Sequence, residues 1–235
     1  MPVPILLYHH IDEAPPRGIP ARSLWVKPQR FARQMQALKM LGFKGLSLRQ
    51  AIPYIRGEKQ GKVAVITFDD GAMSVYRHAM PVLDRLGFSA TCFFVADYIG
   101  GHNGWDKPPR KQAALMGAAE MRDWAARGHE AGSHTLTHPH LPALPPEQAQ
   151  REIVESRQKL EALFGFPLLS FAYPYGEENA AMRRFVGEAG YSYAVTTERG
   201  QAGADNAILA LPRHSVRRND TVIQFLLKCL FRKKG

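Results

Sequence analysis

Short apolar runs alternate with longer segments of helical periodicity along almost the whole chain, and this alternation most constrains the fold. The segments that read as strands are 4–9, 62–68, 89–96, 129–135, 168–176, 192–197 and 208–216. The segments that read as helices are 28–43, 74–88, 113–128, 145–165 and 179–191. In the first helical segment Phe31, Met35 and Leu38 recur at helix spacing, which indicates one apolar face. This order of elements is typical of a largely parallel sheet covered by helices.

The number of strand-like runs predicts the architecture. Seven or eight parallel strands favour a (β/α) barrel, complete or incomplete, and a chain of 235 residues suits a single domain over 1–235. Folds of this class place their chemistry at the carboxyl ends of the strands. Polar residues that follow the apolar runs are therefore the first candidates for a site.

The composition indicates where the protein works and what it contacts. The two cysteines, Cys92 and Cys229, show no disulfide framework, and the opening residues carry no basic stretch typical of a secretory signal. We therefore expect a cytoplasmic protein, with a peripheral position at the inner face of the membrane as the alternative. The net charge of +10 attracts anions such as anionic lipid or acidic glycans, although a basic surface is often only a solvated face.

Two adjacent carboxylates end the second strand-like run, in the stretch AVITFDDGAM over 64–73. Asp69 and Asp70 followed by Gly71 are also what an ordinary turn prefers, because Asp bonds to nearby backbone and Gly accepts positive φ. Their position at a strand end favours a functional role instead. Adjacent residues point in different directions, so each carboxylate can serve a different partner.

Two histidines four residues apart, His134 and His138, lie in SHTLTHPHL over 133–141. On a helical turn this spacing would place both imidazoles on one face, suited to one metal ion. His140 follows a proline and is expected at the surface or beside the site. Two imidazoles and one carboxylate suit Zn²⁺ and similar ions, and three protein ligands leave a position open for catalysis.

The motifs TFDDG (67–71), SHTLTHPHL (133–141) and FAYPYG (171–176) together resemble successive motifs of the polysaccharide deacetylases, the NodB-type carbohydrate esterases. The opening LLYHHI (6–11) resembles more narrowly the branch that contains poly-N-acetylglucosamine deacetylases. The resemblance covers roughly residues 5–220. It implies a distorted or incomplete α/β barrel of the NodB-homology type, with a divalent metal and a carbohydrate substrate.

The resemblance also implies roles for individual residues. Asp69 would be the general base that activates a metal-bound water, and Asp70, His134 and His138 would ligate the metal. Zn²⁺ is the expected ion, with Co²⁺ and Ni²⁺ as alternatives. The backbone N–H of Tyr175 would stabilise the oxyanion from a rigid turn.

The general acid has two candidates, because His is the side chain best suited to this role near neutral pH. Many family members carry the acid in a late Leu-x-His motif, which His214 in LPRHSV matches approximately. The branch with an opening Tyr-His indicates His9, which we favour. The neighbouring His10 is expected to be a hydrogen-bonded core histidine.

The chain departs from the family at one motif. The family commonly has an Arg shortly before its Pro-Tyr, whereas residues 170–173 here are Ser-Phe-Ala-Tyr. We hypothesise that Arg213 supplies this charge and orients Asp69; the alternative is a surface arginine. Trp105, in a Gly- and Pro-rich loop, is either a wall for a sugar ring or an anchor for that loop.

The last segment, 221–235, is a basic amphipathic helix with Val222, Phe225, Leu226, Cys229 and Leu230 on one face. Docking on the barrel is one interpretation. The other is contact with an anionic membrane surface, which would suit a lipid-linked sugar substrate.

The predicted function is metal-dependent removal of N-acetyl groups from an N-acetylhexosamine-containing glycan or lipid-linked sugar. An O-acetyl esterase is the alternative within the enzymes, since the same site attacks either carbonyl. A non-catalytic module that binds anionic ligands is the alternative from another class. We expect no nucleic-acid partner, and the sequence does not indicate an oligomeric state.

Overall fold

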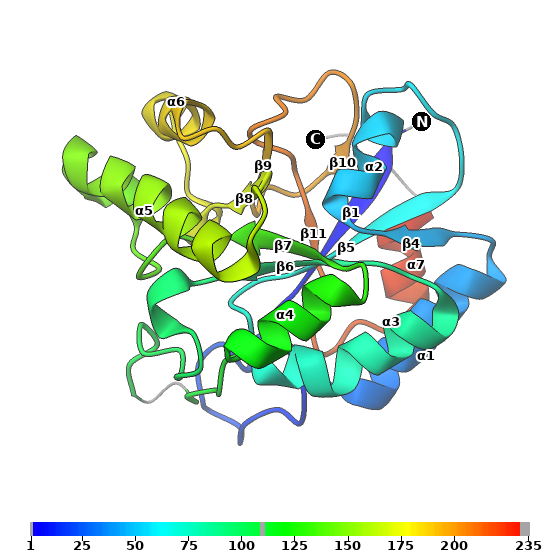
Figure 1. Ribbon diagram of the computed structural model, residues 1–235. Helices are drawn as coiled ribbons and strands as arrows, with labels where there is room; N and C mark the ends of the chain where they lie inside the picture. Colours follow the sequence, from blue (N-terminus) through cyan, green and yellow to red (C-terminus); the bar gives the residue numbers. More distant parts are fainter. Residues whose placement is uncertain (1, 109–110, 231–235) are drawn as a thin grey trace.

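The computed structural model describes residues 2–108 and 111–230, and its centre is a curled, mostly parallel sheet (Figure 1). The strands of this nine-stranded sheet are β1 (Val3–Tyr8), β4 (Lys44–Leu46), β5 (Val63–Phe68), β6 (Thr91–Phe94), β7 (Glu130–Ser133), β8 (Ser170–Ala172), β9 (Tyr193–Val195), β10 (Gln201–Ala202) and β11 (His214–Ser215). Seven strands follow one path, β10-β1-β5-β6-β7-β8-β9, with β11 paired to β1 and β4 to β5. Only β10 pairs antiparallel among these described strands. The predicted incomplete (β/α) barrel is confirmed.

Helices cover the outside of the sheet, except α2, which packs against the opposite face (Figure 1). They are α1 (Pro28–Met40), α2 (Leu48–Ile55), α3 (Met80–Leu86), α4 (Ala118–Ala126), α5 (Pro146–Phe164), α6 (Ala180–Glu188) and α7 (Val222–Leu230). Short helical turns complete the chain: η1 (Arg22–Leu24), η2 (Val75–Ala79), η3 (Ala96–Tyr98), η4 (Leu141–Ala143) and η5 (Pro174–Gly176). A separate two-stranded ribbon joins β2 (His10–Ile11) to β3 (Trp25–Val26).

Alternation along the strands builds two apolar clusters. In β5, Ala64, Ile66 and Phe68 belong to the larger cluster, between the sheet and the helices. Val63 and Val65 belong to the smaller one, which α2 joins through several apolar side chains. The strands are thus buried on both faces, as expected for parallel sheets.

Two predicted helices begin well after their predicted first residues. The segment 113–128 becomes helical only at Ala118, because the preceding residues form isolated bridges such as Ala72 with Leu115. The Glu120 carboxylate accepts a hydrogen bond from the Gly117 N–H (2.9 Å), which fixes the start of the helix. The segment 74–88 opens with the π-helical turn η2 and becomes α3 just before Pro81.

The C-terminal helix α7 lies against the barrel. Phe225 and Cys229 are buried, and α7 contacts α1 and β1. Ile223, Leu227 and Leu230 are exposed on it. The basic end of the predicted segment, 231–235, lies outside the described residues.

None of the helices in the described ranges is both long and apolar enough to cross a bilayer.

Candidate active site

Polar side chains converge at the edge of the sheet where its parallel strands end. Asp69 and Asp70 directly follow β5, and His134 directly follows β7. The Asp69 N–H donates to the Tyr8 carbonyl (3.0 Å), and the His134 N–H donates to the Phe94 carbonyl (2.9 Å), so both residues continue their strand ladders. The strands therefore fix these backbones before any ligand binds.

Asp70, His134 and His138 form a compact, buried cluster of ligand atoms, all within 4.8 Å of one another. The Asp70 Oδ1 atom lies 3.7 Å from His134 Nε2 and 3.5 Å from His138 Nε2. These separations are long for hydrogen bonds, but donors that share a tetrahedral ion at ~2.0–2.2 Å lie about 3.3–3.6 Å apart. The donor set and its spacing therefore fit a divalent metal ion.

A backbone carbonyl orients the first of these imidazoles. His134 Nδ1 donates to the Ala172 carbonyl at 2.7 Å, so Nε2 carries the lone pair that faces Asp70. Metal-binding histidines characteristically have such a partner on the second nitrogen.

The predicted helical turn over His134–His138 is wrong: these residues form an irregular loop. Thr135 and His138 have positive φ values of 69° and 63°, which no helix accommodates. Glu152 on α5 holds the loop, since its carboxylate accepts from the N–H groups of Leu136 and Thr137, both at 2.9 Å. The two imidazoles meet because of this tether and not because of helical spacing.

Asp69 forms a buried, bidentate ion pair with Arg213. The guanidinium donates from Nη1 to Oδ1 at 2.8 Å and from Nη2 to Oδ2 at 2.7 Å. Arg213 is fully buried, and its remaining donors bond to the Thr196 carbonyl (2.7 Å) and the Thr67 hydroxyl (3.1 Å). The structure thus places a cation on Asp69 where the usual motif position lacks one.

The two adjacent carboxylates have opposite electrostatic settings. Burial alone would raise the pKa of Asp69, but the charge and hydrogen bonds of Arg213 act together with the charges of His134 and His9 and lower that pKa to about 2. Burial and the negative charge of Asp69 raise the pKa of Asp70 well above its usual range. The pKa of Asp69 is therefore lowered and that of Asp70 raised, and a cation beside Asp70 would favour its ionised form.

The backbone around the cluster is unusual as well. Five non-glycine residues of the described chain have positive φ, and four of them are Asp70 (75°), Thr135, His138 and Tyr175 (59°). Such conformations cost about 1 kcal/mol each for most residues and concentrate at functional sites.

His9 is partly buried, and its pKa responds to the charges of Asp69, Arg213 and His134, which places it near the cluster. Burial lowers its pKa to about 4, while the charge of Asp69 acts in the opposite direction. His10 points elsewhere: it is buried and stacks on Trp25 with a centroid distance of 4.0 Å. Its Nδ1 has no hydrogen-bond partner among the described residues, so the core position is observed without the expected hydrogen bond on that atom.

His214 is not brought to the cluster. It follows Arg213 directly, and successive residues of an extended strand point to opposite sides. Its side chain lines a cavity with α7, and its pKa responds to the charges of Arg199 and Lys228 and not to Asp69. Of the two candidate acids, His9 is therefore the one near Asp69.

Aromatic rings surround the second imidazole of the cluster. Trp105 stacks on the His138 ring at 4.7 Å, and Tyr175 meets the same ring edge-on at 4.7 Å. Tyr175 also stacks on the exposed His140 at 3.9 Å. Trp105 is thus anchored through a candidate ligand, and its use as a wall for substrate stays a prediction.

Sequence reasoning missed the residues that hold the site from outside. Glu152 acts on the loop, and Thr67 and Thr196 act on Arg213; Glu152 and Thr196 lie in segments that look ordinary in sequence, whereas Thr67 is the first residue of the motif TFDDG. Only the Thr residues at strand ends offered a signal, since polar residues there often face the site.

Comparison with known proteins gives a consistent result. A family model described as polysaccharide deacetylase matches residues 56–194. A Bacillus subtilis protein named as a polysaccharide deacetylase (YxkH) is 30% identical over 213 residues, which cover 90% of this chain and 70% of that protein. A Staphylococcus epidermidis poly-beta-1,6-N-acetyl-D-glucosamine N-deacetylase is 28% identical over 192 residues, covering 80% of this chain and 66% of that enzyme.

Solved structures share the fold. A Streptococcus pyogenes deacetylase (PplD) in complex with acetate aligns with a TM-score of 0.85 and 26% identity, covering 97% of this chain and 98% of that one. A Bacillus cereus polysaccharide deacetylase aligns with a TM-score of 0.81 and 28% identity, covering 97% and 69%.

Proposed function

Because this chain belongs to the polysaccharide deacetylase family, we propose that it removes N-acetyl groups from an N-acetylhexosamine-containing glycan or lipid-linked sugar, with Zn²⁺ as its ion. The observation that carries the proposal is the buried Asp69–Arg213 pair next to the Asp70, His134 and His138 cluster. A structural role alone does not require so many polar groups to be buried together at one strand edge. The same arrangement argues against a non-catalytic binding module.

Asp70, His134 and His138 would hold the ion. When bound, a divalent ion supplies Lewis acidity, which lowers the pKa of a water to about 7 and polarises the acetyl carbonyl.

Asp69 is the proposed base. Arg213 holds its carboxylate ionised and fixed in orientation, ready to accept a proton from the attacking water. The rigid turn η5 fixes the backbone of Tyr175, and we assign its N–H to the oxyanion that develops on the acetyl group.

His9 is the proposed acid for the leaving amine. Its pKa of about 4 leaves few protonated imidazoles at neutral pH, so we infer that His9 passes on the proton that Asp69 has taken from water. The attraction between Asp69 and the protonated His9 favours this transfer.

The test measures acetate released from N-acetylglucosamine oligomers of β-1,4 and β-1,6 linkage and from a lipid-linked N-acetylhexosamine. Each substrate is assayed after chelation and again after addition of Zn²⁺, Co²⁺ or Ni²⁺. Asp69→Asn should keep one equivalent of metal, measured by elemental analysis, and lose activity by at least about 10³-fold. His134→Ala should lose both the metal and the activity. A fully active Asp69→Asn enzyme would exclude Asp69 as the base.

An O-acetylated sugar separates the two kinds of acetyl bond. His9→Ala should abolish turnover of the amide and only slow turnover of the ester, since an alkoxide leaves more readily than an amine. If the wild-type protein releases acetate from the O-acetyl sugar alone, the proposal of an N-deacetylase is wrong and the esterase takes its place.

A further inference from the structure

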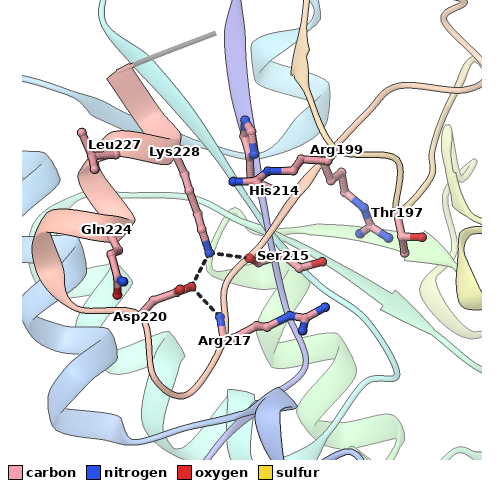
Figure 2. A pocket seen from close by; sticks show the side chains of 10 residues that line it. Thr197, Arg199, His214, Ser215, Arg217, Asp220, Gln224, Leu227 and Lys228 are labelled. Atoms are coloured by element: carbon pink, nitrogen blue, oxygen red, sulfur yellow. Dashed lines mark hydrogen bonds and ion pairs between the residues drawn. The ribbon is translucent and has the colours of Figure 1, made fainter. Parts of the chain in front are cut away.

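A cavity of about 730 Å³ lies between α7, β11 and the segment that follows β9 (Figure 2). Its volume is within the range typical of small-molecule sites. Its wall is formed by Thr197, Arg199, Arg213, His214, Ser215, Arg217, Asp220, Gln224, Leu227 and Lys228.

This cavity is distinct from the candidate active site, although Arg213 belongs to both walls. The Arg213 guanidinium is fully engaged by Asp69, Thr67 and Thr196, while the next side chain along the strand, His214, lines the cavity.

His214 is a buried polar group without a protein partner. It is 3% exposed, and neither Nδ1 nor Nε2 makes a hydrogen bond with any residue in the described part of the chain. In Figure 2 the His214 ring lies between the Lys228 and Arg199 side chains. Burial and these two cations lower its pKa to about 4, so the ring is neutral at physiological pH and offers one donor and one acceptor. Buried polar atoms are normally satisfied, and a ligand in the cavity would satisfy these.

The charges of the cavity wall are not balanced. Lys228 pairs with Asp220 and donates to the Ser215 carbonyl at 2.8 Å, so its charge is compensated. The Arg199 and Arg217 side chains, by contrast, make no ion pair or hydrogen bond with other described residues. The wall therefore carries two uncompensated positive charges, one on Arg199 beside the unsatisfied imidazole and one on Arg217 elsewhere on the same wall.

We propose that this cavity binds a phosphate monoester, with Arg199 and Arg217 pairing to the phosphate oxygens and His214 bonding to the same group or to a hydroxyl beside it.

The charge of the ligand follows from the charge of the wall. A phosphate monoester carries a charge of about −1.5 to −2 at pH 7. This charge balances the two unpaired guanidinium groups more fully than the single negative charge of a carboxylate ligand would. The planar fork of arginine also suits phosphate oxygens. The exposed Leu227 and Ile223 on α7 lie on the helix that borders the cavity, so the ester could be soluble or carried by a lipid.

The experiment titrates the 235-residue protein with inorganic phosphate and with a hexose 6-phosphate, following backbone amide shifts by NMR. Arg199→Ala/Arg217→Ala should weaken the binding of both by at least about tenfold, as expected for lost charged hydrogen bonds. His214→Leu should weaken the binding of the sugar phosphate by about fivefold or more, and the free hexose should not bind. Arg151→Ala/Arg184→Ala is the matched control, since it removes the same charge from exposed positions on α5 and α6 and should bind like wild type.

The two sources of the phosphate are separated by cosedimentation with vesicles that contain phosphatidic acid or only phosphatidylcholine. A lipid-borne phosphate is indicated if wild type binds both the soluble ester and the acidic vesicles, and if Arg199→Ala/Arg217→Ala loses both while the control variant loses neither. A free metabolite is indicated if wild type binds the soluble ester but not the vesicles. The proposal is wrong if wild type and Arg199→Ala/Arg217→Ala bind phosphate equally, if the control loses binding to the same extent, or if vesicles bind without the soluble ester.

Discussion

The Asp69–Arg213 pair shows how much one buried contact constrains. Both groups are removed from water, and each is tolerable only because the other is present. Arg213→Met should therefore leave an uncompensated carboxylate in the interior and lower the free energy of unfolding by about 3–5 kcal/mol. Urea denaturation, performed with excess chelator in every sample, measures this loss.

The double variant Asp69→Asn/Arg213→Met is the control, because it removes both charges and keeps the volumes similar. It should regain most of the lost stability while remaining inactive. A double variant that is as unstable as Arg213→Met would mean that packing, and not the charge on Asp69, explains the loss.

His10 provides a prediction about pH. Burial lowers the pKa of His10 from its ordinary value of 6.5 to about 3. Between pH 6.5 and pH 3, His10 is therefore protonated in the unfolded chain and neutral in the folded protein. Stability is then complete above pH 6.5 and decreases as the pH falls. Through His10 alone, the free energy of unfolding should be about 2 kcal/mol lower at pH 5 than at pH 7.

The measurement compares His10→Phe with wild type at both pH values in the presence of chelator. Phe keeps an aromatic ring against Trp25 and cannot titrate. The stability difference between the two proteins should change by about 2 kcal/mol in favour of His10→Phe on going to pH 5. An unchanged difference would mean that His10 titrates normally in the folded protein.

At the scale of elements, the loop between β7 and η4 depends on one distant carboxylate. Glu152 accepts three hydrogen bonds from the loop that carries His138, including 2.6 Å from the Thr137 hydroxyl. Glu152→Gln should loosen that loop and weaken Zn²⁺ affinity by about 10–100-fold, as for other residues that orient metal ligands. Competition with a zinc-binding dye measures the affinity directly, without reference to activity.

Glu155→Gln is the matched control on the same helix, since Glu155 pairs only with the exposed Arg151 among described residues. Its zinc affinity should equal that of wild type. Equal losses in the two variants would mean that the charge of α5 as a whole, and not the tether, acts on the site.

Sequence alone could predict the composition of the site but not how its parts are held. Asp69, Asp70, His134 and His138 follow apolar runs, so strand ends bring them to one edge. The turn that joins the two histidines depends on a carboxylate 14 residues beyond His138, and local spacing suggested a helix instead. Long-range side-chain contacts of this kind leave no periodic trace in the sequence.

Dependence on long-range contacts also explains why the sequence did not predict helix α2. Helix α2 contains Pro53 and only eight residues, so its periodicity is too short to recognise. Its cap is local, since the Gln50 N–H donates to the Ser47 hydroxyl, but its stability comes from packing against β1 and β5. The long amphipathic helix α5, in contrast, lies within one residue of its predicted bounds at both ends.

At the scale of the whole molecule, α7 contributes to the core. Phe225 is fully buried in the main cluster, with α7 against α1. Phe225→Ala should lower the free energy of unfolding by about 3–5 kcal/mol, measured by urea denaturation. The control Ile223→Ala removes an apolar side chain that is 72% exposed and should change stability by less than about 0.5 kcal/mol. Similar effects of the two substitutions would mean that α7 does not dock as described.

The overall architecture was the most predictable property, because it rests on alternation repeated over the whole chain. Each strand and helix adds an independent constraint, and right-handed crossovers leave few ways to join them. The final segment was the exception: the same apolar face suits a core and a membrane surface. In the structure Phe225 and Cys229 of that face are buried in the core, whereas Leu230 is exposed, and contact with a membrane stays a prediction.

The positive φ values at the site affect any attempt to graft the site onto another protein. A typical loop of the same composition would not adopt the left-handed conformation that is found at Asp70, Thr135, His138 and Tyr175. These side chains would therefore lose their relative positions on another half-barrel. To keep the positions, the connecting loops and the distant residues that hold those loops would have to be transferred as well.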